Sequence, residues 1–169
     1  GRREEMTRFL CDLVNVESIT CHEEQAVALV ARQMEQLGYD EVIIDSTGNV
    51  VGRIGNGPKT LVCDAHLDVV DAEGQEWQSD PFRAEVRGNR IYGRGTVDDK
   101  GPFVAMLYAG KAIQELGLAE SYTVYVVGSI AEEDCEGLAL GAFLEEYGII
   151  PDQVVIAESR ELQICRGHR

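Results

Sequence analysis

Several features that would place this chain in well-known classes of protein are absent from its 169 residues. No apolar run approaches the roughly 20 residues that a membrane-spanning helix needs. The first five residues carry no apolar core of the kind that a signal peptide has. There are also no internal repeats and no low-complexity linkers. We therefore expect a cytoplasmic protein without a membrane partner, whose chain forms one domain or part of a larger one.

Basic residues are few. The chain has 15 lysines and arginines against 30 aspartates and glutamates, which gives a net charge of −15. A phosphate backbone would be repelled by such a surface, so we do not expect nucleic acid as a partner. Most of this charge is interpreted as solvated acidic surface. Some carboxylates nevertheless cluster in loops between apolar runs, where cations could use them.

The cysteines do not form the pattern of a small disulfide-bonded protein. The five cysteines are odd in number and no two of them form a Cys-x-x-Cys pair. A set of disulfide bonds is therefore not expected, and neither is a zinc site built from thiolates.

The spacing of apolar residues predicts an alternation of helices and strands. Helical spacing runs through residues 3–16, 23–37, 103–116 and 137–147. Apolar and β-branched runs predict strands at 42–44, 50–54, 82–86, 90–92, 122–130 and 153–157, and another that begins at Leu61. Strands and helices that alternate along a chain are typical of an α/β fold. We expect a mixed, partly parallel sheet flanked by helices.

Three of the predicted strands end in side chains that could bind a metal, and a Gly-rich loop before a helix carries another. These side chains are His66 and Asp68, Glu132 and Glu133, Glu158 and, in the loop, Asp98. In open α/β sheets, ligands bind outside the carboxyl ends of the strands, so we expect these side chains to converge. One imidazole and several carboxylates suggest a zinc site with mixed nitrogen and oxygen ligands.

Each of these signals is weak when it is taken singly. A lone His-x-Asp is more often structural, and a Glu-Glu pair is usually solvated surface. Here the pair Glu132-Glu133 directly follows an apolar strand, where a solvated face is not expected. Two adjacent carboxylates cannot point the same way, so one could hold a metal while the other faces a substrate. His22 is interpreted as an exposed residue near a helix start.

The order and spacing of these motifs resemble the M20 family of zinc-dependent amidohydrolases and exopeptidases, which includes acetylornithine deacetylases, succinyl-diaminopimelate desuccinylases, carboxypeptidase G and carnosinases. The likeness rests on HLDVV at residues 66–70, GRGTVDDKG at 93–101, Glu132-Glu133 after one strand and Glu158 after the next. These motifs span most of the chain. The segment EEDCEGL at 132–138 also resembles a subgroup of hydrolases linked to selenium metabolism. A zinc exopeptidase-like catalytic domain is implied.

The resemblance assigns roles to the motif residues. It implies His66 and Glu158 as ligands of a first zinc, Glu133 as a ligand of a second, and Asp98 as a bridge between the two. Asp68 would hold the imidazole in the right tautomer, and Glu132 would act as the general base. Cobalt or manganese could replace zinc at such a site. A cis peptide bond between Asp98 and Asp99 is also implied.

The implied reaction is hydrolysis of an amide bond in a small N-acyl amino acid or a dipeptide. Zinc would lower the pKa of a bound water from about 15.7 toward about 7. Glu132 would accept the proton of this zinc-bound water and later pass it to the leaving amine.

The family pattern also contains parts that we do not find in the chain. One more histidine for the second zinc, a lid and a dimerisation domain are expected beyond the stretch that resembles residues 164–169. Residues 1–169 are therefore expected to form the N-terminal part of a catalytic domain that is incomplete at its C-terminus and inactive alone. The full-length protein is expected to form a homodimer. His168 lies where the family has no ligand, and we do not expect it to bind metal.

Two other functions remain open. A descendant without activity could keep the fold as a binding or scaffolding module, although the intact set of ligands and base argues against it. A metal enzyme of other chemistry, such as a phosphatase, would need a loop that cradles phosphate. Residues 58–60 lack the spacing of a phosphate-binding loop, and residues 93–95 lack the third glycine of the dinucleotide pattern.

Overall fold

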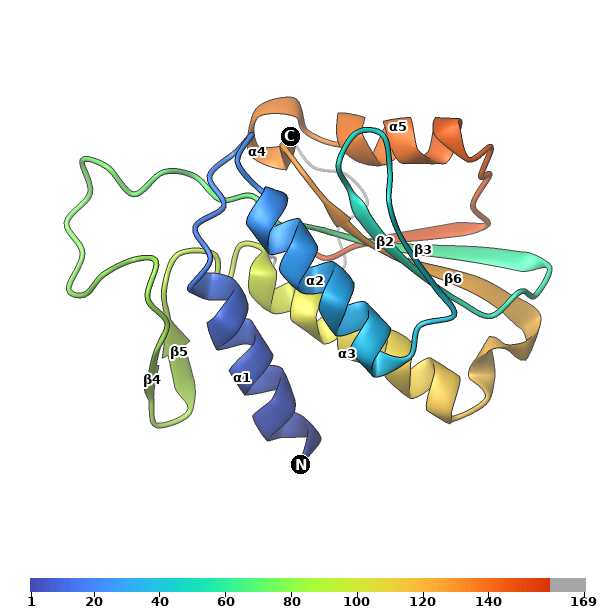
Figure 1. Cartoon of the computed structure of the whole chain (residues 1–169), viewed down its shortest axis with the longest axis horizontal. Coiled ribbons are helices and arrows are strands. Elements are labelled where there is room, and N and C mark those ends of the chain that lie inside the picture. The colour runs from blue at the N-terminus through green and yellow to red at the C-terminus, as the bar shows by residue number, and fades with distance from the viewer. Residues whose placement is uncertain (159–169) are drawn as a thin grey trace.

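A five-stranded sheet forms the centre of the molecule, and helices cover both of its faces (Figure 1). The computed structural model describes residues 1–158. The sheet has the order β1-β2-β6-β3-β7, and its strands are β1 (Glu41–Ile44), β2 (Val50–Ile54), β3 (Lys59–His66), β6 (Tyr122–Ser129) and β7 (Gln153–Ile156). β3 pairs in parallel with β6 and β7, whereas β1, β2 and β6 pair antiparallel. The expected mixed, partly parallel sheet flanked by helices is confirmed.

Side chains that alternate between the two faces of the central strands form two hydrophobic cores, one on each face of the sheet. In β6, Val124 and Val126 face the larger core, while Val127 faces the smaller one. The larger core lies under α1 (Arg2–Val14), α2 (Glu24–Leu37) and α3 (Lys100–Glu115). The smaller core lies under α5 (Leu138–Glu146) on the opposite face. Because side chains of a strand alternate between faces, a continuous apolar run such as β6 is buried on both sides.

The start of α3 differs from the sequence pattern. Apolar spacing predicts a helix from residue 103, but α3 begins at Lys100. Its first turn is Lys-Gly-Pro, which has no apolar period to detect. Pro102 is compatible with this position because the backbone N–H groups of a first helical turn have no partner within the helix.

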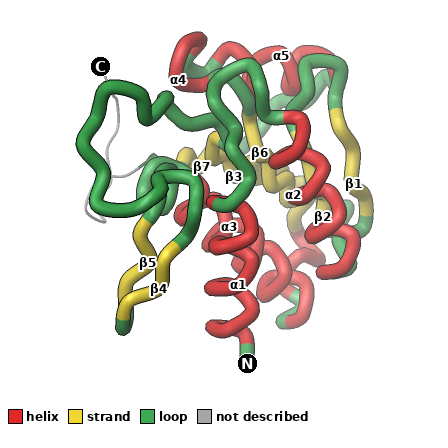
Figure 2. The backbone as a smooth tube through the Cα atoms, turned by 60° about the vertical axis from the view of Figure 1, so that its left-hand side comes forward, coloured by secondary structure: helices red, strands yellow, loops and turns green. Residues whose placement is uncertain are grey.

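A hairpin and three short elements complete the described chain. β4 (Glu85–Arg87) and β5 (Arg90–Tyr92) pair through the predicted turn at residues 88–89, and the hairpin stands beside α1, apart from the main sheet (Figure 2). Two short helices, η1 (Leu118–Ser121) and α4 (Glu132–Cys135), flank β6, and Ile19 forms an isolated bridge with Val69. None of the helices in residues 1–158 is long and apolar enough to cross a membrane.

Phe143 anchors α5 to the sheet, and we predict that Phe143→Ala lowers the free energy of unfolding by about 3–5 kcal/mol. The side chain is fully buried, and its ring lies edge-on to Tyr125 of β6 with 5.8 Å between the centroids. Urea unfolding followed by circular dichroism measures the change. Leu138→Ala in the same helix is the control, because Leu138 is exposed and its truncation should change stability by less than about 0.5 kcal/mol. Equal effects of the two variants would contradict the anchoring role.

Candidate metal centre

The carboxyl ends of the three parallel strands bring the predicted site residues together. His66 is the last residue of β3, Glu132 and Glu133 open α4 just after β6, and Glu158 follows β7. Asp98 comes from the loop that precedes α3. Parallel strands end at the same edge of a sheet, and this edge is where ligands of α/β folds bind.

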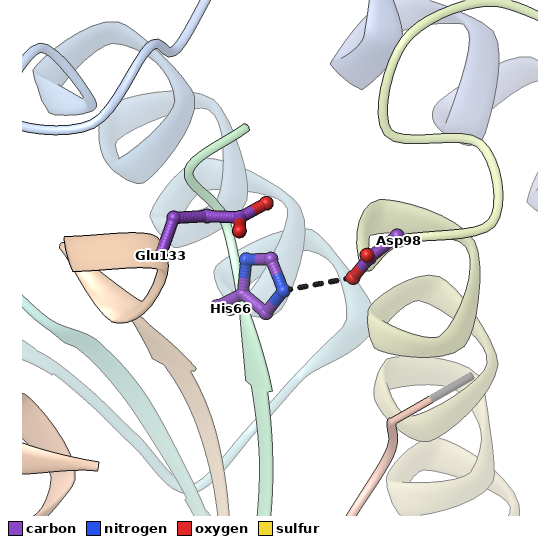
Figure 3. Close-up of side chains that lie close together, drawn as sticks. All are labelled: His66, Asp98 and Glu133. Atoms are coloured by element: carbon purple, nitrogen blue, oxygen red, sulfur yellow. Dashed lines mark hydrogen bonds and ion pairs between the residues drawn. The ribbon is translucent and has the colours of Figure 1, made fainter. Parts of the chain in front are cut away.

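The carboxylates surround one nitrogen of the His66 ring. Nε2 lies 3.1 Å from Oδ1 of Asp98, 3.9 Å from Oε2 of Glu132 and 4.0 Å from Oε1 of Glu158. Figure 3 shows the Asp98 and Glu133 carboxylates on different sides of the ring. Two groups of three have ligand atoms within 4.8 Å of one another: His66 with Asp98 and Glu133, and His66 with Glu132 and Glu158. Both groups contain His66, so the carboxylates of Asp98, Glu132, Glu133 and Glu158 gather around this one imidazole.

The other ring nitrogen, Nδ1, fixes the orientation and the tautomer of the His66 ring. Nδ1 lies 2.9 Å from the backbone carbonyl oxygen of Asp68 and 3.3 Å from its carboxylate Oδ1. A carbonyl oxygen can only accept, so Nδ1 carries the hydrogen and donates it. Nε2, the ring atom that a metal would bind, then faces the carboxylates.

Asp68 joins the ring to the start of α4. Its carboxylate is fully buried and accepts hydrogen bonds from the backbone N–H groups of Glu132 at 3.1 Å and Glu133 at 3.2 Å. It also accepts one from the Thr20 hydroxyl at 2.8 Å. Burial alone would raise the pKa of Asp68, but the hydrogen bonds from His66, Thr20 and the two backbone groups outweigh it and lower the pKa. Asp68 is thus an ionised acceptor that positions both neighbouring glutamates.

Negative charge at the site exceeds what the described residues compensate. Burial lowers the pKa of His66, but its hydrogen bond to Asp68 and the surrounding carboxylates prevail and raise it to about 10. Burial raises the pKa of Glu132 and of Glu133. Asp99 is fully buried, neither of its carboxylate oxygens has a hydrogen-bond partner among residues 1–158, and burial raises its pKa to about 8.

A bound cation would satisfy this arrangement. Carboxylates removed from water are stable when they are paired or coordinate a metal, and at this site four partly exposed carboxylates crowd around one imidazole. One imidazole nitrogen and several carboxylate oxygens form a donor set that suits zinc, and also cobalt or manganese. The residues therefore fit the metal that the sequence predicts.

The first turn of α3 is held in place behind Asp98. Lys100 is fully buried, and its Nζ donates to the backbone carbonyls of Leu13 at 3.0 Å and Val16 at 2.9 Å, at the end of α1. Carbonyls at a helix C-terminus are free to accept and favour a positive partner. Burial lowers the pKa of Lys100 to about 8. The peptide bond between Asp98 and Asp99 is cis, which confirms that prediction.

Sequence reasoning missed several residues that shape the site. Thr20 and Glu23 contact it from the loop before α2, and their partners are 48 and 108 residues away along the chain. No local signal could have found these two. Asp64 carried a signal, because a charged residue within the apolar run of β3 is unusual. His22 is exposed, as predicted, and His168 lies outside the described residues.

Comparisons with known proteins show what this chain is similar to. The model of Peptidase family M20/M25/M40 matches residues 62–164. Over 166 residues the chain is 43% identical to the uncharacterized protein YgeY of Escherichia coli (strain K12). The aligned region covers 98% of this chain and 41% of that protein. It is 29% identical over 134 residues to the probable succinyl-diaminopimelate desuccinylase of Staphylococcus epidermidis, with 77% of this chain and 33% of that protein covered.

A solved structure shares the fold. The M20 family metallo-carboxypeptidase Sso-CP2 from Sulfolobus solfataricus superposes with a TM-score of 0.78 and 25% identity, over 90% of this chain and 37% of that one. The two proteins share the α/β sheet, and in this chain a cluster of acidic side chains lies at the carboxyl edge of that sheet. The chain belongs to the peptidase family M20/M25/M40. It spans about two fifths of the length of YgeY.

Asp64 lies two residues before His66 on β3, is 5% exposed, and its Oδ1 has no hydrogen-bond partner among residues 1–158. Burial raises its pKa from 3.8 to about 7. Between these values the folded state keeps a proton that the unfolded state has released, so this group makes the free energy of unfolding fall as pH rises. The slope is at most about 1.4 kcal/mol per pH unit. We predict that Asp64→Asn removes this component.

Urea unfolding of the metal-free protein at about pH 5 and pH 7 measures the effect. Asp64→Asn should gain stability relative to the wild type at the higher pH, because asparagine does not titrate. Asp71→Asn, at an exposed position, controls for loss of one carboxylate. If the difference between Asp64→Asn and the wild type is the same at both pH values, Asp64 does not titrate in this range.

Proposed function

We propose that the whole protein is a binuclear zinc hydrolase that cleaves the amide bond of a small N-acyl amino acid or a dipeptide. In this proposal residues 1–169 supply the N-terminal part of its catalytic domain. The observation that carries it is the cluster of four carboxylates, from Asp98, Glu132, Glu133 and Glu158, around the His66 imidazole. Membership of the M20/M25/M40 family supports a peptidase or amidohydrolase activity. The names of two proteins that it resembles, a probable succinyl-diaminopimelate desuccinylase and a metallo-carboxypeptidase, are in keeping with cleavage of an amide bond.

The ligands divide between two positions. His66, Glu158 and Asp98 would hold the first zinc, since Nε2 of His66 lies within 4.0 Å of a carboxylate oxygen of each of the other two. Asp98 would bridge to a second zinc held by Glu133, and its side chain is 59% exposed, which leaves room for a second contact. The remaining donor of the second zinc would come from outside residues 1–158, as the family resemblance implies.

When bound, zinc supplies a Lewis acid that polarises a carbonyl group and lowers the pKa of water. The chain's own residues supply the rest. Glu132 is half-buried, its backbone is held by Asp68, and its carboxylate faces the same ring nitrogen as the ligands. Its pKa, raised by burial, suits a group that accepts a proton from the attacking water and delivers it to the leaving amine nitrogen. Asp68 keeps the His66 ring oriented during both transfers.

The place of the protein in the cell and its assembly are also part of the proposal. We infer a cytoplasmic enzyme that acts as a homodimer on a small substrate. The relation of residues 132–138 to the subgroup linked to selenium metabolism stays a prediction.

His66→Ala is expected to remove zinc. His66 is the one nitrogen ligand proposed for the first zinc, so the variant should lose at least one of the two zinc ions that we expect per whole protein. Elemental analysis of the purified wild type and variant measures this. His22→Ala, which removes an exposed histidine, should keep the full zinc content. A wild type that holds no metal would contradict the proposal.

Glu132→Gln is expected to lower turnover by about 10²–10⁴-fold while zinc content stays unchanged, because the amide cannot accept the proton. Product analysis with N-acetyl amino acids, dipeptides and phosphate esters measures turnover and identifies the substrate class. Asp134→Asn is the matched control, since this carboxylate lies in the same helical turn and is exposed. Full activity of Glu132→Gln would remove Glu132 from the base role. Release of phosphate alone would replace the amide-hydrolase proposal with a phosphatase.

A further inference from the structure

The segment at residues 18–23 braces the metal centre from the side of α2. The Ser18 hydroxyl donates to the backbone carbonyl of Leu67 at 2.7 Å, and the backbone N–H of Val69 donates to the carbonyl of Ser18 at 2.9 Å. The Thr20 hydroxyl donates to Asp68, as described above. This segment therefore runs along the residues that follow His66. Glu23 closes it.

Glu23 makes its contacts away from its own helix. It is the residue before α2, yet its side chain forms no capping hydrogen bond there. The side chain is 3% exposed, and Oε1 accepts hydrogen bonds from the backbone N–H groups of Cys21 at 2.9 Å and Ala131 at 3.0 Å. Ala131 has a φ of 53°, an uncommon value for a residue with a Cβ, and it directly precedes Glu132. The carboxylate thus contacts the backbone at the point where β6 turns into α4.

Three consecutive backbone N–H groups at this turn are held by carboxylates from distant parts of the chain. Ala131 donates to Glu23, whereas Glu132 and Glu133 donate to Asp68. The helix that follows has only four residues and cannot fix this orientation by its own hydrogen bonds. The direction of the Glu132 and Glu133 side chains therefore depends on both carboxylates.

We propose that Glu23 is a positioning residue of the candidate metal centre, which acts through Ala131 to aim Glu132 and Glu133. The inference rests on the proposed hydrolytic function for its effect on turnover. Its effect on the backbone at residues 131–133 is independent of that function. What Glu23 contributes is an acceptor oxygen at the right reach, rather than its charge.

Two substitutions separate reach from charge. Glu23→Gln removes the charge but keeps an oxygen at the same reach, whereas Glu23→Asp keeps the charge but is one methylene shorter. We expect backbone amide exchange at residues 131–133 of the metal-free whole protein to match the wild type in Glu23→Gln and to rise about tenfold in Glu23→Asp. In the zinc-loaded protein, kcat should likewise fall about tenfold in Glu23→Asp only, with KM unchanged. Glu24→Gln, at the exposed neighbouring position, is the control for charge near α2.

Three outcomes would overturn the proposal. The reverse pattern, with Glu23→Gln impaired and Glu23→Asp normal, would assign the effect to charge. Equal exchange in all variants would show that Ala131 does not depend on Glu23. A loss of kcat that matches a loss of folded protein, measured by circular dichroism, would reduce Glu23 to general stability. If the wild type has no hydrolytic turnover, the proposed function fails, and the amide exchange still decides the role of Glu23.

Discussion

The buried carboxylate of Asp68 is the interaction on which the arrangement of the site depends. It accepts hydrogen bonds from the start of α4 and from Thr20, and it lies beside the Nδ1 of His66. One side chain therefore ties together the end of β3, the loop before α2 and the turn after β6. An ionised carboxylate can only accept hydrogen bonds, and every partner here is a donor. The same bonds that orient the neighbours keep Asp68 charged, since they lower its pKa despite burial.

Much of this site could be predicted from the sequence because most of its candidate ligands follow strands that are easy to recognise. β6 is an apolar run that packs against both cores, and its carboxyl end leads directly to Glu132 and Glu133. Parallel pairing with β3 then places these glutamates near His66. The pattern of burial fixes each strand, and the topology of the sheet fixes where the strands end together. The positions of the strand ends were therefore sufficient to predict that these side chains lie close to one another.

The remaining parts of the site depend on contacts that no local pattern encodes. α4 is a single turn with no apolar period. Asp68 binds its first N–H groups, and Glu23 binds the N–H of Ala131 just before it, both from far along the chain. The start of α3 at Lys100 depends on carbonyl groups at the end of α1. In both places a polar side chain satisfies backbone groups of another element. Such pairs are set by the tertiary structure, and the sequence shows only that a polar residue is present.

The same electrostatics link metal binding to the stability of the fold. Without a cation, the carboxylates around His66 repel one another, and Asp64 and Asp99 are buried without hydrogen-bond partners for some of their oxygens among residues 1–158. The surrounding core and the hydrogen bonds of Asp68 must hold these groups together against that repulsion. A divalent cation held at this site would bind the folded arrangement and not the dispersed carboxylates of the unfolded chain, so its binding free energy would add to the stability of the fold. A site that is unfavourable when it is empty is in this way already shaped for the ion that it would bind.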